Sequence, residues 1–240
     1  MDHSCCDCLQ TSSAEGKDVG WLEFTLAWVG FLVTHSLPLR PPIRPWLQAR
    51  LGQRGFTIAY SALSLAALVW LIGAAGRAPV VLLWNWTPWQ GHVPLAVMLP
   101  VCVVLALAIG RPNPFSFGGA HNDRFDPTHA GIVRMTRHPI LLALSLWALA
   151  HVVPNGDLAH VLLFGFFAIF AAIGVRLVDR RRQRDMGVAW HRLHAEVTSS
   201  LGTARPTSWG GAIARGIAGV AFYVGLIWVH PWLFGVSPLG

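Results

Sequence analysis

The chain contains six apolar runs, each close to the length that crosses a bilayer as a helix. About 20 residues of α-helix span the ~30 Å hydrocarbon core. The runs do not alternate between polar and apolar residues, as the strands of a membrane β-barrel would. They predict an all-α fold, a polytopic transmembrane helical bundle of about six spans, at residues 21–37, 55–76, 93–110, 139–153, 158–178 and 211–234.

Charged residues make up only 12% of the chain, and the basic ones are segregated. They gather after the first, third and fifth runs, whereas the connections after the second and fourth runs contain Arg77 alone. This alternation follows the positive-inside rule and places both termini outside. The net charge of +7 is therefore explained by topology and by anionic membrane lipid, and we expect no binding of nucleic acid.

We expect a single transmembrane domain at residues 21–240, preceded by a disordered N-terminal tail at residues 1–20. The tail lacks the basic and apolar regions of a signal peptide. Cys5, Cys6 and Cys8 lie there beside His3, but clustered cysteines without a second pair are a weak zinc signal. After the fifth run, Trp190, Leu193 and Val197 share one helical face, which predicts an amphipathic helix along the inner surface.

The histidines in or beside the apolar runs include His35, His138, His151 and His230. Ionisable residues at membrane depth are costly and are functional candidates. His138 and His151 are separated by roughly 20 Å along a helix, so they cannot bind one iron together. The partner of either would come from another helix, and His35 is the obvious donor. Trp28 and Phe31 share a helical face with His35, which suits a tetrapyrrole pocket, although such aromatic stripes more commonly pack helices together.

The Arg137-His138-Pro139 motif opens the fourth run. Proline fits the first turn of a helix because its missing N–H has no partner there in any case. Arg137 and His138 then lie at a helix N-terminus, which attracts anions. The motif therefore predicts a polar or cofactor-binding site for a carboxylate or a phosphate.

Residues 131–200 strongly resemble the NnrU family of bacterial membrane proteins. The matching motifs are GIVRMTRHP, LWALAH, NGDLA, LVDRRR and AWHRLHAEVTS. Earlier segments agree, through THSLPLRPPIRPWLQARLGQRGFTIAYSALSLAALVWL, GRAP and RPNP. The resemblance covers about residues 21–205. It implies a multi-pass protein of the bacterial cytoplasmic (inner) membrane, linked to nitrogen-oxide metabolism and denitrification.

The NnrU family is related to zeta-carotene isomerase, and the resemblance implies a haem b cofactor and cis-trans isomerisation of a carotenoid. The iron ligands of that isomerase correspond to His35 and His151, and His138 corresponds to another of its important histidines. Strict alternation of the spans places His35 inside and His151 towards the outside, so His138 stays open as the alternative partner of His35. The implied partners are a hydrophobic small molecule such as a carotenoid and an unidentified electron donor.

Two other functions stay open. Arg-His-Pro followed by an acidic-basic segment is similar to membrane methyltransferases of the isoprenylcysteine carboxyl type, which bind S-adenosylmethionine. Leu141 and Ala143 replace the Tyr and Gly of that motif, and Asp179 stands with Arg180 in place of its acidic pair. The other alternative is a cofactor-free membrane accessory protein. The residues that we expect to bind a cofactor are His35, His151, His138 and Arg137.

Overall fold

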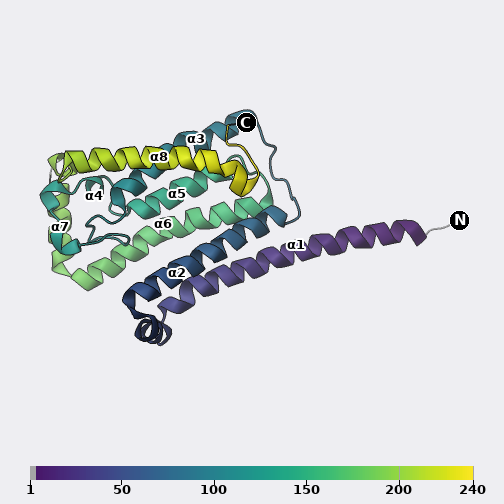
Figure 1. Cartoon of the computed structure of the whole chain (residues 1–240), viewed down its shortest axis with the longest axis horizontal. Coiled ribbons are helices and arrows are strands. Elements are labelled where there is room, and N and C mark those ends of the chain that lie inside the picture. The colour runs from purple at the N-terminus through teal and green to yellow at the C-terminus, as the bar shows by residue number, and fades with distance from the viewer. Residues whose placement is uncertain (1–3, 200, 240) are drawn as a thin grey trace. The chain divides into compact units, whose positions relative to one another are not determined.

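The computed structural model describes residues 4–199 and 201–239, and for residues 4–18 it describes the backbone alone. Within these ranges the chain forms helices and no named strand, which confirms the predicted all-α fold (Figure 1). The predicted tail at residues 1–20, with its three cysteines, falls largely outside the described side chains and stays a prediction.

Among the described residues, five helical segments are long and apolar enough to cross a membrane. The first is Val19–Leu39, which combines the second half of α1 (Ser4–Ser36) with the short helix that follows it. The others are α2 (Ile43–Arg77), α3 (Pro88–Ala108), α6 (Leu158–Met186) and α8 (Trp209–Phe234). The remaining predicted span is α5 (Pro139–Val152), which is shorter. The chain is thus a multi-pass integral membrane protein, and α5 alone falls below the length of an ordinary span.

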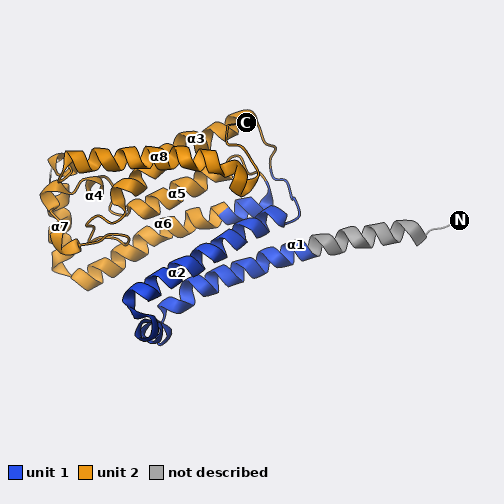
Figure 2. Ribbon diagram, in the orientation of Figure 1, with its two compact units in different colours: residues 1–83, 157–163 blue, residues 84–156, 164–240 orange. Residues whose placement is uncertain are grey.

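The chain divides into two compact units (Figure 2). Unit 1 consists of Met1–Leu83 and Asp157–Leu163, and unit 2 of Trp84–Gly156 and Phe164–Gly240. The boundary between the units crosses α6, whose first turns belong to unit 1.

Unit 1 is built around an antiparallel hairpin of α1 and α2, joined by the short helix η1 (Leu37–Leu39). The two helices approach closely at Gly30, where an added Cβ would lie 2.7 Å from the Trp70 ring. At one end of the hairpin Arg77 Nε donates to Glu23 at 3.1 Å. At the other end the Tyr60 hydroxyl donates to the His35 carbonyl at 2.8 Å. These contacts fix the register of the hairpin.

In unit 2, α3, α5, α6 and α8 lie side by side, and α7 (Val188–Thr198) crosses the end of the bundle (Figure 1). An added Cβ on Gly219 would lie 2.8 Å from the Val103 Cα, so α8 meets the backbone of α3. On α6, Gly174 leaves room for the Leu141 side chain of α5, because an added Cβ would lie 3.2 Å from Leu141 Cδ2. Small residues allow this close approach, which dispersion forces then stabilise within a membrane.

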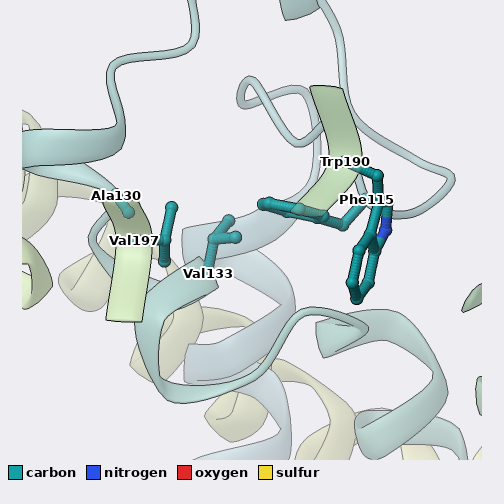
Figure 3. Packing of buried hydrophobic residues seen from close by; sticks show 5 residues of the cluster. All are labelled: Phe115, Ala130, Val133, Trp190 and Val197. Carbon is teal, nitrogen blue, oxygen red and sulfur yellow. The ribbon is translucent and has the colours of Figure 1, made fainter. Parts of the chain in front are cut away.

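The predicted amphipathic helix forms as α7, but its apolar face is covered by protein. Trp190 and Val197 pack with three residues of the segment that precedes α5, namely Phe115, Ala130 and Val133 (Figure 3). The sequence correctly predicts the apolar face of α7 but does not show which part of the molecule covers it. The expectation that this face lies on the membrane surface is therefore corrected.

Candidate functional site

His138 lies at the N-terminal end of α5, with only 3% of its surface exposed. Pro139 occupies the first helical turn, so His138 is the N-cap and keeps non-helical backbone angles. Its Nε2 lies 2.9 Å from Asp179 Oδ1 and its Nδ1 lies 3.0 Å from the Ser116 hydroxyl. A carboxylate only accepts, so Nε2 donates to Asp179; in a neutral ring Nδ1 then accepts from Ser116. Both ring nitrogens are therefore engaged.

Asp179 brings α6 into this site. Its second oxygen, Oδ2, accepts from Arg137 Nη2 at 3.0 Å, and its side chain is 17% exposed. Removing a carboxylate from water is expensive unless charge and hydrogen bonds compensate for it. Here Arg137 supplies the charge and His138 the second hydrogen bond, so both oxygens of the Asp179 carboxylate are satisfied within a network of three side chains.

Arg137 also connects the network to α7. Its Nη1 donates to His194 Nε2 at 3.0 Å, which requires that nitrogen to be unprotonated. The His194 ring is stacked on Trp190, with centroids 4.9 Å apart and planes at 4°. Partial burial first, and the Arg137 guanidinium next, lower the pKa of His194 from its ordinary value of 6.5. A neutral His194 is thus the form that suits its position.

The segment at residues 111–118 holds the network in place. Asn113, which is buried, donates from Nδ2 to the Arg137 carbonyl at 3.0 Å and accepts from the Phe115 N–H at 3.1 Å. Arg182 Nη2 donates to the Ser116 carbonyl at 2.8 Å. The RPNP motif therefore positions the backbone of the Arg-His-Pro motif.

A cavity of about 340 Å³ adjoins the network within unit 2. Arg137, His138 and His194 line it on one side, and side chains of α5 and α6 line it on the other. We call it the Arg137 cavity. A search for metal-binding groups of three or more His, Cys, Asp or Glu side chains finds none among the described residues.

His151 lies at the other end of α5, in the last turn. Its Nδ1 lies 2.8 Å from the Trp147 carbonyl one turn earlier, so Nδ1 carries the proton. Its ring lies 5.3 Å from Phe164 and 5.5 Å from Trp147, centroid to centroid. In the described part of the chain, Nε2 of His151 has no hydrogen-bond partner. This nitrogen remains available to a ligand.

His230 of α8 resembles His151 in the hydrogen bond of its Nδ1. Its Nδ1 is bonded to a backbone carbonyl, that of Val236 at 2.7 Å. The sequence places both histidines within predicted spans, at residues 139–153 and 211–234.

His35 belongs to unit 1, at the end of α1. Its ring is stacked on Phe31 with centroids 5.4 Å apart, and its Nδ1 lies 3.4 Å from the Tyr60 hydroxyl. Of the predicted site residues, the structure therefore joins Arg137 and His138 in one network. It places His151 at the opposite end of α5 and His35 in the other unit.

Three residues of the network were not predicted to belong to the site, namely Ser116, Asp179 and His194. Of the three, Asp179 had the clearest sequence signal for a place in a polar site, because it is the lone acid between Leu158 and Arg184, in a segment that is otherwise apolar or basic. Ser116 and His194 carry no comparable local signal, since their role depends on segments that are distant in the chain.

Fold and site together define a polytopic, all-helical membrane protein with a buried polar network at one end of its bundle. The family model described as NnrU protein matches residues 23–238, nearly the whole chain, and the chain belongs to this family. No curated protein and no solved structure is significantly similar to it.

Proposed function

We propose that this NnrU-type membrane protein binds haem b, with His151 as a residue that would hold the iron. The observation that carries the proposal is the Nδ1–carbonyl bond of His151. A histidine that ligates a metal usually donates its other ring N–H to a carbonyl or carboxylate, which sets the tautomer and the direction of the ring. His151 is held in this manner, with Nε2 left for iron and aromatic rings beside it.

His138 is less suited to this role than His151. Each of its ring nitrogens already has a partner, so iron ligation would break the bond to Asp179 or the bond to Ser116. His35 remains the second ligand that the resemblance to zeta-carotene isomerase predicts. His230 is a second candidate, supported by its own carbonyl-bonded Nδ1.

Bound haem would supply one-electron redox chemistry and, with one position open, a site for nitric oxide or for a carbon–carbon double bond. The residues around His151 would contribute orientation and exclusion of water. Asn155 Nδ2 donates to the His151 carbonyl at 2.7 Å and so anchors the last turn of α5. We extend the proposal to a role in nitrogen-oxide metabolism or in carotenoid isomerisation, which activity assays with each substrate class would separate.

The test is a reduced-minus-oxidised absorption spectrum of the detergent-purified protein, expressed with haem supply. We expect a Soret band and sharp reduced α and β bands, lost in His151→Ala. Loss in His35→Ala or in His230→Ala identifies the second ligand. The control is His191→Ala, which removes an exposed imidazole on α7 and leaves the spectrum unchanged. Colourless wild-type protein, or a His151→Ala variant with an unaltered spectrum, would refute the assignment.

The methyltransferase alternative has one supporting observation. Asp179 lies 2.9 Å from His138, so the motif histidine and a downstream acid do meet. Both oxygens of that acid are already bonded to Arg137 and His138, which leaves it poorly placed to hold S-adenosylmethionine. Calorimetric titration with S-adenosylmethionine tests this function directly, and a protein that binds neither it nor haem would be the accessory protein.

A further inference from the structure

The Arg137 cavity has two kinds of wall. One comes from α4 (Ile132–Met135), the turn before α5, and α7, and it carries the polar groups of Arg134, Thr136, Arg137 and His194 beside some apolar side chains. The other comes from α5 and α6 and is apolar except for Ser145. Its members include Leu141, Leu142, Ala171, Ala172 and Val175. The volume, about 340 Å³, lies in the range of small-molecule sites.

The charge of the polar wall favours an anion. Two guanidinium groups line the cavity, and no acidic residue is among the side chains that line it in the described structure. Arg137 Nε is buried and has no hydrogen-bond partner among these residues. Of the nearby acids, Asp179 binds Arg137 through Nη2, and Glu196 is engaged with the exposed Arg192 at 3.8 Å. Each Nη of Arg137 carries a second N–H besides the one that binds His194 or Asp179, and these donors can bind a further acceptor.

The position of the cavity identifies the rest of the ligand. Between Val175 and Arg180 the sequence of α6 changes from apolar to basic, which marks the boundary between hydrocarbon and head groups. The apolar wall lies on the hydrocarbon side of this boundary and the polar wall on the other side. A ligand that satisfies both walls carries an anionic head group on a hydrocarbon chain.

We propose that the Arg137 cavity binds an anionic phospholipid of the membrane, with its phosphate at Arg137 and an acyl chain along Leu142, Ala172 and Val175. Basic pockets between transmembrane helices on the cytoplasmic side bind such head groups. The proposal is independent of haem, because the cavity lies at the end of α5 opposite His151.

The test is native mass spectrometry of delipidated protein in detergent, titrated with phosphatidylglycerol or with phosphatidylcholine. We expect the wild type to bind phosphatidylglycerol about tenfold more tightly, the effect of one charge-assisted hydrogen bond. Arg137→Gln should remove this preference. Arg192→Gln, which removes an exposed charge from α7, should keep it. Equal binding of the two lipids by the wild type would overturn the proposal. Equal losses of phosphatidylglycerol affinity in Arg137→Gln and Arg192→Gln would overturn it as well.

Arg137→Gln also leaves Asp179 without its cation and could prevent folding, so a second pair of variants tests the apolar wall. Ala172→Phe places a ring in the cavity without touching the polar network and should weaken phosphatidylglycerol binding by about tenfold. Ile173→Phe adds a ring to the next, exposed position of α6 and should bind as the wild type does. Unchanged binding by Ala172→Phe refutes the site. Inorganic phosphate that displaces phosphatidylglycerol at equal concentration would show a site for the free anion and refute the lipid.

Discussion

Arg137 holds two partners through separate nitrogens, Asp179 through Nη2 and His194 through Nη1. A guanidinium suits this position because its donors lie in one rigid plane and keep their charge at every physiological pH. Asp179 in turn is satisfied from two directions, by Arg137 and His138. Loss of one member leaves a buried or half-buried charge without compensation, which is more costly than the net gain from the intact network.

Acidification should weaken this network through His194. Its folded-state pKa lies below 6.5, so the unfolded chain binds the proton first as the pH falls, and stability is lost below about pH 6.5. In His194→Gln the amide oxygen can still accept from Arg137 but does not titrate. The Tm of the wild type in detergent should therefore fall more than that of the variant on acidification. Equal falls in Tm would show that other groups cause the pH dependence.

Contacts between elements depend on a few small residues. Gly219 sits where α8 meets the α3 backbone, and the atoms that a Cβ would meet there are Val103 Cα, at 2.8 Å, and the Cys102 carbonyl, at 3.0 Å. Backbone atoms cannot turn aside as a flexible side chain does. The same two helices are joined by the Tyr223 hydroxyl, which donates to the Leu95 carbonyl at 2.9 Å. Contacts at two places along the helices therefore set the distance between α3 and α8.

Gly219→Ala should therefore separate α3 from α8 and destabilise the protein by about 1–3 kcal/mol, the usual cost of overpacking. Gly225→Ala is the matched control, since it lies on the same helix and its Cβ meets nothing within 4 Å. Thermal unfolding of both variants in detergent measures the difference. Equal stability of the two would mean that α3 and α8 tolerate a wider spacing.

At the scale of the whole molecule, the topology depends on α5. Its 14 residues extend about 21 Å, less than the ~30 Å hydrocarbon core. A short span is accommodated by local thinning of the bilayer and by polar residues at its ends. If α5 crosses, the chain makes six crossings and both termini lie on one side. If it does not, the termini lie on opposite sides.

We expect six crossings, because the basic blocks after α1, α3 and α6 then all lie inside. Alkaline phosphatase, which is active only outside, should be active when fused to the C-terminus or inserted between α2 and α3. Inserted in residues 110–131, it should be inactive. An inactive C-terminal fusion beside an active one between α2 and α3 would show that α5 does not cross.

The sequence by itself determined the class of protein and the places of the spans, and it placed Arg137 and His138 together at the start of one span. These properties depend on hydropathy, charge and motif, which are local along the chain. Only the tertiary structure decided that Asp179, Ser116 and His194 complete the network, that both nitrogens of His138 are engaged, and that protein covers the apolar face of α7. Such contacts join residues that are far apart in sequence, and packing of helices selects one set of partners from many that hydropathy permits.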